Sequence, residues 1–403
     1  MDFGLKLFIP ILINNAILST DIFGAIFILA ILASLRRKKN ADLFPLALTR
    51  ELKGLAILAI IFSHVGYFLV TDHRFLFPLS VMAGTGVNLF LFLSGFGLTM
   101  SSLRKKLSLG KFYKKHFLKL FIPFWIAIAI FFLLDYFLLQ RSYSSGYIIQ
   151  SMLGFFPTGD LFRDVNSPFW FLTPLLFYYL IFPLVFLPKR PWLTAIIVGA
   201  ISYFILQLRL PVSTSILQMY QMHFLAFPLG IAFASLFFEP FYLSRFEPAK
   251  IKSFLCGLQR PVWLKATLDK FRAPNIFHRV FNQLSRPAYF AILAALLIFI
   301  GYFSYYSQVG GIPWHEQGIS LLVMSAIIFF FILKKFEIKL FYLFGFYSYE
   351  IYLIHWPLMS RYDIFFKYVP AWLAMVLYLA LFLLISWPLE KLLCRIHRLK
   401  MLK

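Results

Sequence analysis

Apolar runs of about twenty residues recur along the chain, and they constrain its fold more than any other feature. An α-helix of about this length crosses the hydrocarbon core of a bilayer. The composition agrees, because 61% of the residues are hydrophobic and only 14% are charged, whereas soluble domains are roughly 25% charged. We therefore predict an all-α fold, a polytopic transmembrane helix bundle.

Eleven candidate spans follow from these runs. They lie near residues 16–35, 52–70, 85–101, 118–139, 168–187, 192–208, 219–238, 287–304, 317–333, 341–359 and 370–388. The chain shows no internal repeat, which argues against an inverted-repeat transporter.

The basic residues predict how these spans are oriented. The net charge is +23, from 39 Lys and Arg against 16 Asp and Glu. If Arg36–Lys39 lies inside and the spans alternate, 32 of the 39 basic residues are cytoplasmic, as the positive-inside rule requires. The N-terminus is then outside, the C-terminus is cytoplasmic, and the protein is expected in the cytoplasmic (plasma) membrane. Topology and lipid contact thus explain the charge without nucleic-acid binding.

The longest loop, residues 239–286, is cytoplasmic in this topology. It mixes basic residues with Phe, Leu and Trp, a pattern typical of short amphipathic helices on a membrane surface. The two cysteines, Cys256 and Cys394, are far apart and have no metal-ligand spacing. Neither a disulfide framework nor a metal site is predicted.

The second span carries a cation at one end and a histidine at the other, in KGLAILAIIFSH from Lys53 to His64. Eleven positions place both side chains on one helix face, roughly 16 Å apart along the axis, and Arg50 lies near the same stripe. A histidine within a span is costly and usually faces a polar cavity or the bundle interior. The alternative is that Lys53 is only a flanking anchor and His64 an interhelical hydrogen-bond partner.

The next two spans also contain polar groups. Asn88 lies in the apolar run GTGVNLFLFLSGFGL and needs a partner there, while the glycines favour close helix packing or leave room for a ligand. Lys115, His116 and Lys119 gather at the start of the fourth span. They are either ordinary flanking charges or, with the basic groups of the second span, a site for a phosphorylated ligand.

The fifth and tenth spans supply further candidates. Trp170 lies near the predicted outer interface, where an aromatic-belt role is the default. In GFYSYEIYLIHWPL, Ser348, Tyr352 and His355 are spaced i, i+4 and i+7 on one face. Glu350 is a carboxylate near mid-membrane, which is expensive unless it is paired or protonated. One polar stripe could serve packing alone, but a second histidine on a second span favours a shared polar cavity.

These blocks, taken in order, resemble the acyltransferase-3 family of integral membrane acyltransferases. KGLAILAIIFSH matches that family's Arg/Lys-x10-His signature, and GVNLFLFLSGFGL, FWFLTPLLFYYLIFP and YSYEIYLIHWPL resemble its following blocks. The resemblance covers roughly residues 50–388. It implies a ten-span bundle that moves acyl groups, most often acetyl from acetyl-CoA, onto extracytoplasmic carbohydrate.

The chain departs from the family pattern in two ways. An extra span precedes the signature, so the expected organisation is an N-terminal span with a basic loop (1–49), the acyltransferase bundle (50–388) and a basic cytoplasmic tail (389–403). The family's Arg-x-x-Arg pair is represented only by Lys115 or His116 with Lys119, and lysine lacks the bidentate fork of arginine.

The resemblance assigns expected roles to the candidate residues. Basic side chains would bind the phosphates of acetyl-CoA, the acyl donor: Arg50, Lys53, Lys115 and Lys119. His64 would be the general base, because its reference pKa lies close to the working pH. His355, with Tyr352 and Ser348, would orient the acceptor, stabilise the thioester oxyanion or relay a proton. The carbohydrate or glycolipid acceptor would meet Asn88, Trp170 and Glu350.

Two other classes of function stay open on the sequence. A proton-coupled transporter or exporter of a lipid or sugar could use His64, Glu350 and His355 as a proton relay. The one-sided basic cluster and the missing repeat argue against it. A structural scaffold would leave the buried polar residues unexplained.

Overall fold

Helices make up nearly all of the computed structural model, which describes residues 13–38, 43–66, 74–105, 107–161, 163–236, 284–306 and 312–401. The α-helices are α1 (Ala16–Ala33), α2 (Leu46–Val65), α3 (Ala83–Arg104), α4 (Leu109–Leu139), α5 (Ser145–Met152), α6 (Leu172–Val185), α7 (Pro191–Leu206), α8 (Thr214–His223), α9 (Ala226–Ser235), α14 (Arg286–Tyr305), α15 (Pro313–Leu333), α16 (Lys339–Phe346), α17 (Ser348–Ser360) and α18 (Ala371–Met401). Two short 3₁₀ helices are η2 (Leu79–Val81) and η3 (Ser167–Phe171).

The all-α expectation is confirmed apart from one small β-pair. Strands β1 (Leu35–Arg37) and β2 (Phe336–Ile338) run antiparallel, with Arg36 opposite Glu337. Strand β1 follows α1 and strand β2 follows α15, so the pair holds the ends of these two helices close together.

Eight helical segments of the described chain are long and apolar enough to cross a membrane by their length and composition. They are Ala16–Ala33, Ala83–Arg104, Leu109–Leu139, Ser167–Val185, Thr214–Ser235, Arg286–Tyr305, Pro313–Leu333 and Ala371–Leu393. Every predicted span overlaps a helix, but the count of eleven is not reached. Helix α7 is shorter, α2 carries three charged residues in its first half, and the tenth predicted span is divided into α16 and α17. Of the predicted amphipathic loop, residues 239–283 lie outside the described residues.

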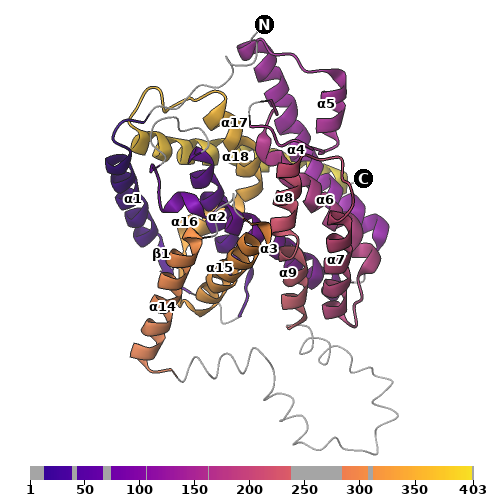
Figure 1. Cartoon of the computed structure of the whole chain (residues 1–403), viewed down its shortest axis with the longest axis horizontal. Helices are drawn as coiled ribbons and strands as arrows, with labels where there is room; N and C mark the ends of the chain where they lie inside the picture. Colours follow the sequence, from indigo (N-terminus) through magenta and orange to yellow (C-terminus); the bar gives the residue numbers. More distant parts are fainter. Residues whose placement is uncertain are drawn as a thin grey trace, which may run out of the picture.

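Helix α2 lies in the middle of the molecule, between α16 and α3 (Figure 1). Glycines bring α2 and α16 into direct backbone contact. A Cβ on Gly54 would overlap the carbonyl of Phe341, and a Cβ on Gly345 would overlap the carbonyl of Arg50. This contact places the rest of α2 beside α17, which continues from α16.

The glycines of α3 act in the same way on two sides. A Cβ on Gly86 would come within 2.8 Å of the carbonyl oxygen of Ala56 in α2. On the opposite side, a Cβ on Gly95 would overlap the carbonyl of Phe227 in α9. Small residues allow helices to approach closely in lipid, so these two glycines serve helix packing.

Helices α8 and α9 form one apolar segment that is interrupted after His223. Pro228 has no N–H to offer the carbonyl of Phe224, four positions earlier. The hydroxyl of Tyr178 donates to that carbonyl at 2.8 Å. The amide of Gln317 donates to the carbonyl of Gln221 at 3.0 Å. Side chains from two neighbouring helices therefore satisfy the backbone where the helix is interrupted.

Helix α1, the predicted extra span, packs against α18 and α16. Phe23 and Phe27 meet the ring of Phe62 edge to face, at centroid distances of 5.5 Å and 5.3 Å. Helix α1 therefore contacts α2 close to His64.

Candidate functional site

Two histidines from different helices meet at the end of α2. Nδ1 of His64 lies 2.9 Å from Nε2 of His355 in α17, and the two rings are stacked at 5.2 Å. The rings of Trp356 and His64 are perpendicular, with their centroids 5.0 Å apart. His355 is completely buried and His64 is half-buried. The sequence predicted a polar cavity shared by these two spans, and the structure brings the two histidine rings into direct contact.

The backbone of α17 fixes where the protons of this pair lie. Nδ1 of His355 is 2.9 Å from the carbonyl oxygen of Tyr352 and 3.1 Å from that of Ile351. Carbonyl oxygens only accept hydrogen bonds, so Nδ1 of His355 carries the proton and Nε2 accepts. Nδ1 of His64 is then the donor between the rings. A neutral His64 therefore carries its lone pair on Nε2, the tautomer that a general base requires.

Tyr352 and Ser348 are near this pair in sequence but have other surroundings. The hydroxyl of Tyr352 donates to the carbonyl of Pro168 at 2.6 Å, and its ring packs on Phe169 and Phe171 of η3. Ser348 is buried at the first residue of α17, and the described residues show no hydrogen bond between it and His355. Tyr352 therefore fixes η3 against α17.

Two buried polar atoms near the histidines have no hydrogen-bond partner in the described part of the chain. They are Oγ of Ser63, next to His64, and Oδ1 of Asn166. The amide nitrogen of Asn166 donates to the carbonyl of Leu353, two residues before His355. Buried polar atoms are nearly always satisfied, so each of these two atoms keeps hydrogen-bonding capacity for a ligand or water.

The basic candidates separate into two groups. Arg50 donates to the hydroxyl of Tyr342 and lies over the rings of Tyr342 and Phe346, at 5.1 Å and 5.0 Å. Lys53 is half-buried and interacts electrostatically with Arg50, Lys119 and Glu350. We call Arg50, Lys53 and Lys119 the basic group.

Lys115 and His116 precede Lys119 in α4, and His116 interacts electrostatically with both lysines. Lys115 is exposed, and its described electrostatic neighbour is His116. The His116 ring packs on Phe112 at 4.4 Å and on Tyr179 of α6 at 5.6 Å. Lys119 is therefore the residue of this segment that approaches Lys53.

Glu350 lies with the basic group rather than with the histidines. It is buried in the first turn of α17, and its charged neighbours are Lys53, Lys119 and Glu390. Five positions before His355 on one helix amount to about 140° of rotation and ~7.5 Å of rise. The two side chains therefore point to different parts of the site, so Glu350 supplies a carboxylate to the lysines.

Asn88 finds its partners in two other helices. Its amide nitrogen donates to Oγ of Ser320 at 2.7 Å, and its oxygen lies 2.9 Å from Nδ1 of His223. The His223 ring stacks on Trp170 at 5.9 Å with an angle of 19° between the planes. Two predicted substrate residues, Asn88 and Trp170, are thus linked through His223. That histidine lies within a predicted span. The rule that drew attention to His64, that a histidine inside a span is costly and usually functional or hydrogen-bonded, would also have identified His223.

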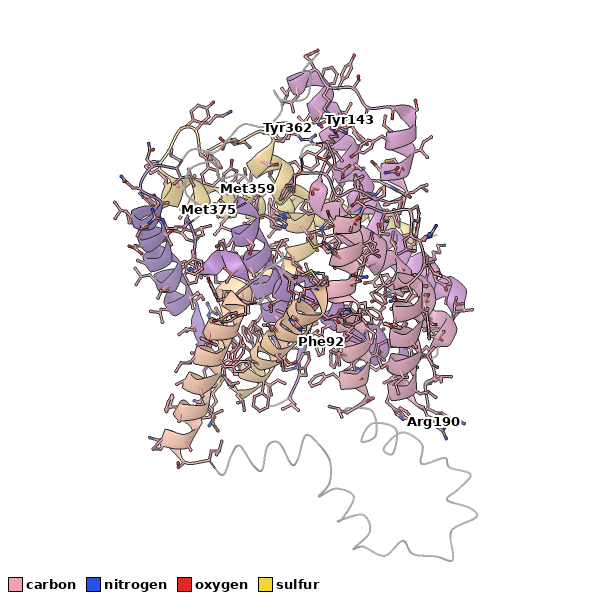
Figure 2. The ribbon with its side chains drawn as sticks, viewed as in Figure 1. Phe92, Tyr143, Arg190, Met359, Tyr362 and Met375 are labelled. Carbon is pink, nitrogen blue, oxygen red and sulfur yellow. The ribbon has the colours of Figure 1, made fainter. Side chains whose placement is uncertain are left out.

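Tyr143 and Tyr362 lie at the opposite end of the molecule from Arg190 (Figure 2) and contact a second set of buried charges. Arg361 pairs with Asp135, which also accepts hydrogen bonds from the hydroxyls of Tyr143 and Tyr362. Burial raises the pKa of the Tyr143 hydroxyl to about 12, so it remains a donor. These contacts join the ends of α4 and α17. Asp135 lies inside the fourth predicted span, which was the signal for this cluster.

Among the described residues no group of three His, Cys, Asp or Glu side chains could hold a metal ion. The tautomer of the histidine pair gives His64 the lone pair of an oriented imidazole base. The basic group lies at the opposite end of the same helix face and suits an anionic ligand.

Comparison with known proteins identifies one family. Residues 52–391 match the acyltransferase-3 family, described as an acyltransferase domain. The match begins in α2 and continues into α18, so it contains both histidines of the pair and leaves α1 outside. No curated protein and no solved structure matches the chain.

Proposed function

The chain belongs to the acyltransferase-3 family and is a membrane-bound acyltransferase, and from this we propose that it carries acetyl from cytoplasmic acetyl-CoA to a hydroxyl of an extracytoplasmic carbohydrate or glycolipid. Family membership decides between the enzyme and the transporter alternative. The acetyl donor and the carbohydrate acceptor are the finer parts of the proposal.

The hydrogen bond between His64 and His355 is the observation that carries the proposed mechanism. A catalytic base needs a lone pair directed at the acceptor and a partner that holds its ring. His355, itself anchored on two backbone carbonyls, is such a partner for His64. We assign His64 as the general base and His355 as the residue that positions it.

The reaction then proceeds in two proton transfers. Nε2 of His64 takes the proton of the acceptor hydroxyl while the hydroxyl oxygen attacks the thioester carbonyl carbon. The carbon–sulfur bond breaks, and the imidazolium returns its proton to the departing CoA thiolate. The products are an O-acetyl ester and the CoA thiol, so atoms and protons balance.

The basic group supports the donor end of the proposal. Arg50, Lys53 and Lys119 offer charge-assisted hydrogen bonds to the phosphates of CoA. Glu350 lies among the lysines and balances part of their charge before the donor binds. The pantetheine arm would follow the face of α2 from Lys53 to His64. This arrangement requires the basic group to face the cytoplasm, as the positive-inside rule proposes.

One experiment separates acyl transfer from transport. Purified protein in nanodiscs is incubated with radiolabelled acetyl-CoA and an extracted cell-envelope glycan. The proposal predicts label in the glycan that alkali releases as acetate, because an ester has formed. A protein that moves labelled glycan across proteoliposomes without forming an ester would contradict it.

A further inference from the structure

His223 is a buried histidine that the proposed mechanism does not use. It is 3% exposed and is the last residue of α8, where the apolar segment is interrupted before α9. Gln317 donates to the carbonyl of Gln221 and Tyr178 to that of Phe224, so the backbone on both sides of His223 is held in place. The position of the His223 ring is therefore fixed by hydrogen bonds to the backbone on both sides of it.

A chain of hydrogen bonds fixes the tautomer of His223. The hydroxyl of Ser320 donates to the carbonyl of Gln317 at 3.2 Å, so its oxygen accepts from the amide nitrogen of Asn88. The other end of the Asn88 amide is then the oxygen, which only accepts, and Nδ1 of His223 must donate to it. Nε2 of a neutral His223 carries the lone pair. In the described residues, that nitrogen has no hydrogen-bond partner.

Segment η3 connects His223 with the catalytic histidines. Trp170 stacks on His223, and Pro168, two residues earlier, accepts from the hydroxyl of Tyr352 in α17. The carbonyl of Tyr352 in turn holds Nδ1 of His355. Segment η3 therefore contacts His223 through Trp170 and α17 through Pro168.

The chemistry of this place suits a sugar-like molecule. Trp170 is half-buried and supplies an aromatic surface, and Nε2 of His223 accepts a hydrogen bond. Such a combination of an apolar surface with a few placed polar groups is typical of small-molecule sites.

We propose that His223 and Trp170 form an acceptor subsite, in which Nε2 of His223 accepts a hydrogen bond from a hydroxyl of the acceptor that is not acetylated. The inference rests on the proposed function and adds His223 to it. In this role His223 orients the acceptor, while proton transfer stays with His64.

The test uses two substitutions that keep different nitrogens of the ring. In His223→Asn the amide takes the place of Nδ1 and can still donate to Asn88, but nothing replaces Nε2. In His223→Gln the amide takes the place of Nε2, and the bond to Asn88 is lost. His315→Asn is the matched control, because His315 is an exposed histidine at the start of α15.

The probe is submicellar octyl-β-D-glucoside, a defined amphipathic glycoside, with radiolabelled acetyl-CoA and protein in nanodiscs. We expect wild-type protein and the control to acetylate the glucoside. His223→Asn should raise KM for the glucoside by about tenfold, the worth of one hydrogen bond, with kcat and CoA binding nearly unchanged. His223→Gln should change KM less.

Other results would overturn the inference. A purely structural His223 predicts the reverse order, with His223→Asn like wild type and His223→Gln impaired. If His223→Asn changes only kcat, the subsite is contradicted. It is also contradicted if wild-type protein acetylates envelope glycan but transfers nothing to the glucoside. Absence of transfer to any acceptor would instead remove the proposed function. If His223→Asn loses CoA binding and so has not folded, Trp170→Phe carries the test, with an expected severalfold rise in KM.

Discussion

The buried charges of this bundle act in two different ways. Glu51 and Lys334 form a fully buried pair beside the β1–β2 strands, where Glu51 also accepts from the backbone N–H of Ile338 and Lys334 donates to the carbonyl of Phe336. Lys53 has only partial compensation, because two of its three charged neighbours are also basic. The first arrangement is structural, and the second leaves positive charge available for a ligand.

Lys334→Met should therefore destabilise the fold. Glu51 would remain buried without its partner, which costs about 3–5 kcal/mol in the free energy of unfolding. Lys339→Met is the matched control, because Lys339 is 41% exposed and lies 4.0 Å from Glu337, and it should cost less than about 1 kcal/mol. Thermal unfolding in detergent measures both variants. Equal unfolding temperatures would show that the buried pair does not stabilise the fold.

Lys53→Ala should act on the donor and leave the fold unchanged. Loss of a charge-assisted hydrogen bond to phosphate should raise the Kd for CoA by about tenfold or more. Lys189→Ala, a change at an exposed lysine between α6 and α7, should leave the Kd unchanged. Calorimetric titration with CoA decides this, and unaltered affinity in both Lys53→Ala and Arg50→Ala would remove the donor site.

Among the helices, the position of α2 is determined by its contacts with α16 and α3. Backbone contact with α16 at Gly54 and close packing with α3 at Gly86 leave the stripe from Lys53 to His64 between them. Because α16 continues into α17, the same contact aligns His355 with His64.

Gly54→Ala should disturb this alignment. Its new Cβ would overlap the carbonyl of Phe341, and such overpacking costs about 1–3 kcal/mol. Gly97→Ala, also in a helix but with no atom within 4 Å of the new Cβ, should be neutral or stabilising. The unfolding temperature and the transfer rate should both fall in Gly54→Ala and should not fall in Gly97→Ala. A wild-type rate in Gly54→Ala would show that this contact does not position the histidines.

For the whole molecule, the sequence predicted the helices well because hydropathy is a local property. It also placed Lys53 and His64 on one face, since they share a helix. It expected Glu350 at the acceptor, whereas the structure gives it lysine neighbours, and it did not single out His223 or Arg361. These three are decided by contacts between helices far apart in the chain, such as that of Arg361 with Asp135, 226 positions earlier. Hydropathy does not contain that information.

The orientation of the bundle is a prediction at this same scale. Helix α7 runs from Pro191 to Leu206, so the residues that flank it should face opposite sides of the membrane. In protein with both native cysteines replaced by serine, Lys189→Cys should react with an impermeant maleimide only from the cytoplasm, and Arg209→Cys only from outside. The reverse labelling pattern would invert the topology and move the basic group away from cytoplasmic CoA.

The central claim is that His64, held by His355, is the base that activates the acceptor. The most direct measurement takes His64→Gln, wild type and His315→Gln in nanodiscs, with CoA binding and acetyl transfer determined on each preparation. Glutamine keeps a hydrogen-bonding side chain but cannot accept the acceptor's proton. The account predicts transfer slower by about 10²–10⁴, with CoA binding nearly unchanged and His315→Gln like wild type. Substantial transfer by His64→Gln would contradict it.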